Sequence, residues 1–105
     1  MQDGSAAPEM ERVPVLVVDA LEENLANVAA FLGDSTYDLV MVQSGREALR
    51  HLLSRDFGVV LLDVRMPELD GFETATMIRR HPRRKNTPLI FVTACYPDDV
   101  EMLRG

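Results

Sequence analysis

Short apolar runs alternate along the chain with longer segments in which apolar residues recur every three or four positions. The runs at Val13–Val18, Tyr37–Val42, 59–62 and 89–93 are rich in valine, leucine and isoleucine and are nearly continuous. Such runs are typical of parallel strands that are covered on both faces of a sheet. We therefore predict four parallel strands with a helix after each of them.

The segments between these runs have helical periodicity and helix-capping residues. One helix carries an apolar stripe of four residues, Leu21, Leu25, Val28 and Leu32. Gly33 follows that stripe as a C-cap residue, and Pro97 is expected to begin a fourth helix. Ser44 and Asp70 each precede a glutamate by three residues, which is the capping-box pattern. The alternation of strands and helices along the chain predicts a doubly wound α/β fold with right-handed crossovers.

The composition narrows the class of protein. The 105 residues suffice for one domain, and 17 Asp and Glu against 11 Lys and Arg give a net charge of −6, which argues against nucleic-acid or membrane binding. The one cysteine, Cys95, predicts a reducing compartment, and the absence of a secretory pattern is consistent with a cytoplasmic protein. Residues 1–12 are expected to be a flexible lead-in to a domain at 13–105.

One cluster of basic residues, RRHPRRK at positions 79–85, interrupts this acidic chain. Its position between a predicted helix and the last predicted strand favours a solvated loop. A phosphate-binding patch is the less favoured interpretation.

Three polar side chains are predicted to meet at one edge of the sheet. Asp19, Asp63 and Thr93 end the first, third and fourth predicted strands. Open α/β sheets bind ligands beyond the carboxyl ends of their strands. Two carboxylates and a hydroxyl suit Mg²⁺ together with a phosphoryl group, and a carboxylate can itself form an acyl phosphate. Asp19 taken alone would more often be a helix N-cap.

Three segments, VLVVDALEENL, LLDVRMPELDGFE and PLIFVTA, resemble the receiver domains of two-component response regulators in both motif and spacing. The resemblance runs from about Val13 to the end of the chain. It implies a CheY-like, flavodoxin-like fold with strand order 2-1-3-4, shortened here to about four of the usual five βα units. It also implies a signalling domain rather than an enzyme, with a sensor histidine kinase or phosphotransfer protein as its partner.

The resemblance also assigns roles to individual residues. Asp63 would accept the phosphoryl group from a kinase phosphohistidine, and Thr93 and Ala94 would bind that group and couple it to a surface change. Mg²⁺ would be held by Asp19, Asp63 and the backbone carbonyl of Arg65. Met66 and Pro67 belong to the loop after Asp63, and Arg65 and Cys95 occupy positions that tune the lifetime of the acyl phosphate.

Ala20 is the first departure from the receiver pattern. Receivers usually have two adjacent acids here, and the second ligates Mg²⁺ directly, whereas Ala20 offers no ligand. Loss of a residue that only hydrogen-bonds to a metal ligand costs roughly 10–100-fold in metal affinity. Loss of a carboxylate that binds the metal directly should cost at least as much. We therefore expect slow phosphorylation with a raised Mg²⁺ requirement. Removal of one carboxylate also lessens repulsion within the acidic cluster.

The second departure lies at the end of the chain. The sequence stops at Gly105, before the fifth strand and helix of a receiver and before the lysine that usually contacts the phosphoryl group. The run Leu89–Val92 would then be an apolar sheet edge, a feature that proteins normally cover. Either the chain is a fragment, or a second copy covers this edge by dimerisation or by segment exchange.

Other protein classes fit less well. A phosphatase of the haloacid dehalogenase type needs an acid where Arg65 stands, and no G-x-G-x-x-G follows the first strand. The alternative that stays open is a degenerate pseudo-receiver, which binds proteins without being phosphorylated. Ala20 favours this alternative, whereas Asp63, Thr93 and the Met66–Pro67 loop count against it.

Overall fold

The structure is a computed structural model that describes residues 12–33 and 36–92, and over these residues the predicted alternation of strands and helices is confirmed. The elements in chain order are β1 (Val13–Val18), α1 (Glu22–Leu32), β2 (Tyr37–Val42), α2 (Gly45–Ser54), β3 (Val59–Asp63), α3 (Gly71–Arg80) and β4 (Leu89–Val92). The strands form one parallel sheet in the predicted order β2-β1-β3-β4. None of the described helices has the length and apolar character of a membrane span.

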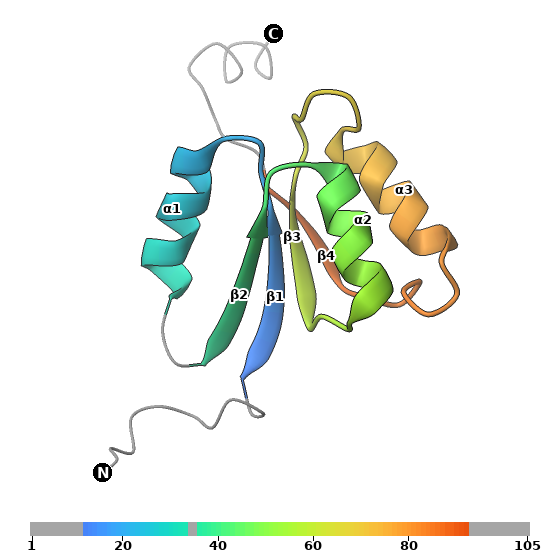
Figure 1. Ribbon diagram of the computed structural model, residues 1–105, viewed down its shortest axis with the longest axis horizontal. Helices are drawn as coiled ribbons and strands as arrows, with labels where there is room; N and C mark the ends of the chain where they lie inside the picture. The colour runs from blue at the N-terminus through green and yellow to red at the C-terminus, as the bar shows by residue number, and fades with distance from the viewer. Residues whose placement is uncertain (1–11, 34–35, 93–105) are drawn as a thin grey trace, which may run out of the picture.

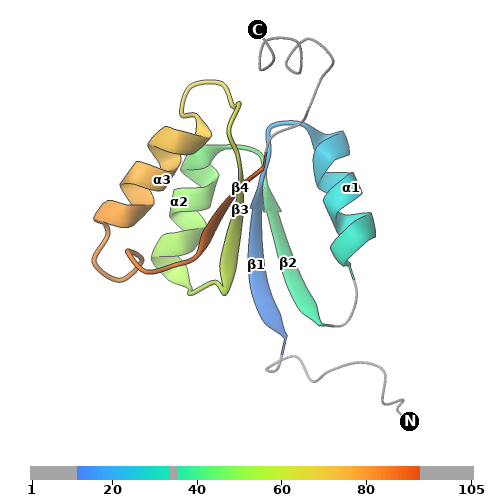
Figure 2. The ribbon, with the colours of Figure 1, turned by 180° about the vertical axis from the view of Figure 1, so that it is seen from behind.

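The molecule has three layers, with α1 on one face of the sheet and α2 and α3 on the other (Figure 1). The view from behind shows the same separation (Figure 2). The larger core lies under α2 and α3 and contains Leu16, Val18, Ala48, Leu52, Val60, Leu62 and Ile78. A smaller core under α1 contains Val15, Val17 and Leu25. The central strand β1 contributes to both cores, which explains why its sequence is apolar without interruption.

Side-chain caps begin two of the helices where the sequence predicted them. Asp70 accepts a hydrogen bond from the Glu73 amide at 2.8 Å, and the Glu73 carboxylate accepts one from the Asp70 amide at 2.9 Å, which completes the capping box of α3. Ser44 accepts a hydrogen bond from the Glu47 amide at 3.2 Å, which is the first half of that motif. Gly33 is the C-cap of α1, and its amide donates to the Ala29 carbonyl.

The prediction of a solvated loop at residues 79–85 is wrong for Arg84, which is buried. Its guanidinium donates to the Leu52 carbonyl and forms an ion pair with Asp56 at 2.5 Å. A buried guanidinium is tolerated when fixed acceptors replace its lost water, and these two groups provide them. Arg84 therefore ties the α3–β4 connection to the end of α2.

The strand β4 pairs with β3 alone, so it forms one edge of the described sheet. Ile90, Phe91 and Val92 are all exposed, which agrees with the apolar edge predicted for this segment. The Phe91 ring contacts Phe72 of α3, with the ring centroids 4.9 Å apart. This contact holds one face of β4 against α3.

Candidate functional site

The strands β1 and β3 bring Asp19 and Asp63 together. Val18 pairs with Leu62 in the parallel register, so the next residue of each strand lies at the same edge of the sheet. Both carboxylates are buried, with 8% of Asp19 and 7% of Asp63 exposed. Their side chains interact directly, and they are the only described carboxylates that are buried. The sequence prediction that these two residues converge is therefore confirmed.

The surroundings of Asp63 raise the pKa of its carboxyl group above the ordinary value of 3.8. Burial is the largest cause, because it penalises the ionised form. The negative charge of Asp19 and a side-chain hydrogen bond with Asp19 act in the same direction. The Arg65 amide, which donates to Asp63 Oδ1 at 3.3 Å, partly opposes this rise because it favours the ionised form.

Asp19 also organises the start of α1. Its Oδ1 accepts hydrogen bonds from the Leu21 amide at 3.0 Å and from the Asn24 side chain at 3.2 Å. The N-cap residue of α1 is Leu21, so Asp19 braces the helix from two residues before it. Both hydrogen bonds fall on the same oxygen, so this oxygen of Asp19 is committed to the start of α1.

The loop after Asp63 is folded closely back onto the site. Gly71 begins α3, and its amide donates to the Val64 carbonyl at 3.1 Å. A Cβ atom at Gly71 would lie 2.2 Å from the Asp63 carbonyl oxygen, so only glycine fits there. Within this loop Met66 is buried in the larger core, and Glu68 adopts a φ of 66°. The loop is therefore tied to the core and to the backbone of Asp63 itself.

Ala20 lies beside the site without contributing a polar side chain. Its methyl group packs against the larger core, which includes Met66. Its backbone carbonyl accepts a hydrogen bond from the Gln43 side chain at 3.3 Å. Over the described residues no group of three or more His, Cys, Asp or Glu side chains converges, so the acidic site consists of Asp19 and Asp63.

A model of the response regulator receiver domain matches residues 15–103. The chain belongs to this receiver family. Its members are domains of two-component signalling, and the acceptance of a phosphoryl group and the binding of Mg²⁺ are general in the family.

Curated proteins of two-component and related signalling are similar to this chain in sequence. The histidine-protein kinase BarA of Escherichia coli is 32% identical over 80 residues, which cover 76% of this chain. A probable cyclic di-GMP phosphodiesterase of Vibrio cholerae is 30% identical over 95 residues, which cover 90% of it. The chain spans only 9% of that kinase and 21% of that phosphodiesterase.

The fold likeness extends to solved structures. The chemotaxis response regulator CheY4 of Vibrio cholerae has a TM-score of 0.74 and 31% identity, and the match covers 86% of this chain and 76% of that chain. The N-terminal domain of a receiver protein from Methanoculleus marisnigri also has a TM-score of 0.74, at 28% identity. That match covers 88% of this chain and 76% of the other.

The structure places some of the predicted site residues of this receiver. Arg65 and Pro67 are exposed in the loop after Asp63, whereas Met66 is buried. Thr93, Ala94 and Cys95 lie outside the described residues. Their predicted roles at the end of the fourth strand therefore stay predictions.

Two residues that shape the pair of Asp19 and Asp63 were not predicted from the sequence. Asn24 donates a hydrogen bond to Asp19, and Gly71 permits the close approach of α3 to Asp63. Glycine is a poor helix former, so its occurrence at the first position of α3 could have indicated a close backbone contact at Gly71. The hydrogen bond of Asn24 could not be predicted from helical periodicity, because its partner Asp19 lies before the helix.

Proposed function

We propose that Asp63 is the phosphoacceptor of this receiver and that its donor is the phosphohistidine of a sensor histidine kinase or phosphotransfer protein. The observation that carries this proposal is the buried pair of carboxylates at the ends of β1 and β3. Asp63 is the member of the pair that ends β3, where the family places its phosphoacceptor. The signalling domain is not itself an enzyme beyond the transfer to and from its own side chain.

The proposed transfer follows from the state of the Asp63 carboxylate. One of its oxygens attacks the phosphorus atom of the donor, a carboxyl O–P bond forms, and the N–P bond to the imidazole breaks. The electron pair of the N–P bond leaves with the imidazole nitrogen. The raised pKa makes the ionised carboxylate a stronger base, and hence a better nucleophile, than an exposed aspartate.

The residues present fit a divalent cation, although they provide few ligands. Two buried carboxylates of like charge repel each other, and Mg²⁺ is commonly held by one or two carboxylates with water and phosphate oxygens. Asp19, Asp63 and the Arg65 backbone carbonyl would hold the ion. When bound, Mg²⁺ neutralises negative charge on the transferred phosphoryl group and on the acidic pair.

Ala20 weakens this metal site in our proposal. Its methyl group packs against the core, and no other described acid takes the place of the missing ligand. Asp19 Oδ1 already accepts two hydrogen bonds from the start of α1, so this oxygen is partly committed to the helix. Receivers with two adjacent acids should bind Mg²⁺ at least ~10–100-fold more tightly.

The remaining roles are carried over from the family to matching positions. Thr93 and Ala94 bind the phosphoryl group and transmit its presence, and Arg65 and Cys95 tune its hydrolysis. Met66 and Pro67 shape the loop after Asp63. The domain acts in the cytoplasm, where its kinase partner presents the phosphohistidine.

Intact-mass spectrometry tests the proposed phosphoacceptor directly. The chain is incubated with Mg²⁺ and a small-molecule phosphodonor, and a gain of one phosphoryl group is expected. Asp63→Asn should abolish the gain, whereas Asp70→Asn should leave it intact because asparagine also caps helices well. Phosphorylation of the Asp63→Asn variant to the original extent would refute the assignment.

A pseudo-receiver that binds proteins without phosphorylation is the second candidate, and Ala20 is the observation that favours it. Beryllofluoride mimics a phosphoryl group and separates the two candidates. A phosphoacceptor predicts that a beryllofluoride–Mg²⁺ mixture shifts the NMR signals around Asp63. A pseudo-receiver predicts unchanged signals even at high Mg²⁺.

The apolar edge at β4 supports a proposed self-association of this chain, by dimerisation or by exchange of a segment. Ile90, Phe91 and Val92 are exposed along an edge that pairs with no other described strand. Light scattering should therefore give a mass above that of a monomer, and Ile90→Lys should lower it because an edge lysine opposes strand pairing. A monodisperse monomer of the original chain would contradict this proposal.

A further inference from the structure

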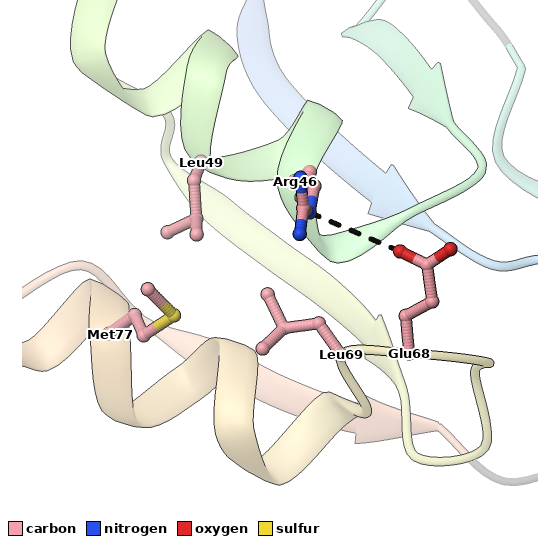
Figure 3. A pocket seen from close by; sticks show the side chains of 5 residues that line it. All are labelled: Arg46, Leu49, Glu68, Leu69 and Met77. Atoms are coloured by element: carbon pink, nitrogen blue, oxygen red, sulfur yellow. Dashed lines mark ion pairs between the residues drawn. The ribbon is translucent and has the colours of Figure 1, made fainter.

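Two cavities that share lining residues form an apolar groove between α2 and α3, on the face of the sheet opposite α1. The first cavity has a volume of about 430 Å³ and is lined by Arg46, Leu49, Glu68, Leu69 and Met77. Figure 3 shows these side chains coming from α2, from the loop before α3 and from α3 itself. A second cavity shares Leu49 and Met77 with the first and extends along the helices as far as His81.

Two apolar side chains in this groove are unusually exposed for their size. Leu53 is 66% exposed and Met77 is 45% exposed, and they project from opposite walls. Leu49 of α2 and Leu69 of the loop before α3 also line the groove. Methionine side chains adapt their shape to a bound surface, so Met77 suits a docking groove. The apolar lining is therefore available to a partner.

More arginines than acidic residues lie beside the groove, although the chain as a whole is acidic. Arg46 and Glu68 form an ion pair at 4.0 Å at the end of the groove beside the loop before α3, drawn as a dashed line in Figure 3. Helical periodicity places Arg50 beside Leu53 on α2, and both Arg80 and Glu73 beside Met77 on α3. The Glu73 carboxylate accepts a hydrogen bond from the Asp70 amide in the capping box of α3. Neither Arg50 nor Arg80 forms an ion pair with a described residue.

We infer that the α2–α3 groove docks an amphipathic helix that carries acidic residues on the flanks of its apolar stripe. The apolar stripe would contact Leu49, Leu53 and Met77, as in helix-in-groove recognition. The acidic flanks would pair with Arg50 and Arg80 on the two walls. Each wall helix has 10 residues, or about 15 Å, so about three turns of a partner helix fill the groove.

This inference is independent of the phosphorylation of Asp63. It rests on the lining and the charges of the groove, which lies outside the acidic site. The groove does begin at the loop that follows Asp63, because Glu68 and Leu69 of that loop line one end of it. A partner held here would therefore touch the segment that connects Asp63 to α3.

The test uses a fluorescein-labelled synthetic helix of about 18 residues, a length at which designed helices form in water. Its apolar residues are spaced at i, i+3, i+4 and i+7, and its flanks carry either glutamate or lysine. Fluorescence anisotropy with the full chain should show that the glutamate peptide binds at least about tenfold more tightly than the lysine peptide. Equal binding of the two peptides, or no binding of either, would overturn the inference.

Matched variants locate the binding. Leu53→Glu should weaken the glutamate peptide about tenfold or more, because a buried leucine contact is lost. Phe31→Glu is the control, since Phe31 is 89% exposed on α1, on the opposite face. Because both residues are exposed, both variants should fold, which circular dichroism verifies. The same weakening by both variants would overturn the inference.

Charge reversal and self-association complete the test. Arg50→Glu combined with Arg80→Glu should reverse the preference, so that the lysine peptide binds more tightly than the glutamate peptide. An unchanged preference would contradict the proposed pairing.

A second copy of the chain is the other possible occupant. A fall in sedimentation mass on Leu53→Glu, without peptide binding to the original chain, would assign the groove to that copy and overturn the inference.

Discussion

Asp19 and Asp63 lie side by side at the carboxyl ends of neighbouring strands, and both carboxylates are buried. Asp19 contributes to the raised pKa of Asp63 through its charge and through a hydrogen bond. The pair therefore costs folding free energy in the absence of a cation. A cation or an added positive charge beside the pair would offset this cost.

The first prediction concerns Asp63→Asn in metal-free protein. At neutral pH this variant should be more stable than the original by about 0.5–1.5 kcal/mol, because an amide removes the like-charge contact and can donate to Asp19. Thermal unfolding in the presence of a chelator measures the difference. Added Mg²⁺ should then stabilise the original chain more than the variant. A variant that is less stable without metal would contradict this account of the pair.

The same pair predicts a pH dependence of stability. The pKa of Asp63 is higher in the folded protein than the ordinary value of 3.8, so the folded state holds this proton more tightly than the unfolded state. The resulting stabilisation is complete below pH 3.8 and is lost as the pH rises through the folded pKa. The advantage of Asp63→Asn should therefore shrink as the pH falls. An advantage that grows towards acid pH would have the wrong sign.

Gly71→Ala tests the close approach of α3 to Asp63. The new Cβ would lie 2.2 Å from the Asp63 carbonyl oxygen, so the loop or the helix must shift. We expect a loss of about 1–3 kcal/mol in the free energy of unfolding, as for other overpacked sites. Chemical denaturation measures it, with Thr76→Ala on the exposed face of α3 as the control. Equal stability of both variants would show that the approach is looser than described.

Arg84→Ala tests the buried arginine of the α3–β4 connection. The variant loses the hydrogen bond to the Leu52 carbonyl and the ion pair with Asp56. We expect a destabilisation of about 2–4 kcal/mol, because a buried acceptor is left unpaired and a cavity forms. Arg83→Ala, in the same basic segment but exposed, should change stability by less than about 0.5 kcal/mol. Similar effects of the two substitutions would mean that Arg84 is solvated after all.

The sequence predicted the fold well because its main signals are local. The apolar runs at Val13–Val18 and Tyr37–Val42 match β1 and β2 residue for residue. Asp70 caps the start of α3 as predicted, because its capping box depends on residues within one helical turn. Convergence of Asp19 and Asp63 followed from parallel pairing, which places the ends of adjacent strands together.

What the sequence did not predict depends on contacts between distant segments. The burial of Arg84 requires an acceptor from Leu52 and a carboxylate from Asp56, which lie about 30 residues earlier in the chain. The contact between Gly71 and the Asp63 backbone depends on the path of the intervening loop. Neither leaves a periodic or spacing signal that a single sequence could reveal.

The Mg²⁺ dependence of phosphorylation tests the central claim, that Asp63 accepts a phosphoryl group at a metal site weakened by Ala20. Initial rates with a small-molecule phosphodonor are measured across a Mg²⁺ titration for the original chain and for Ala20→Asp. We predict that the original chain needs at least ~10–100-fold more Mg²⁺ than Ala20→Asp for half-maximal rate. Superimposable titration curves for the two proteins would contradict it.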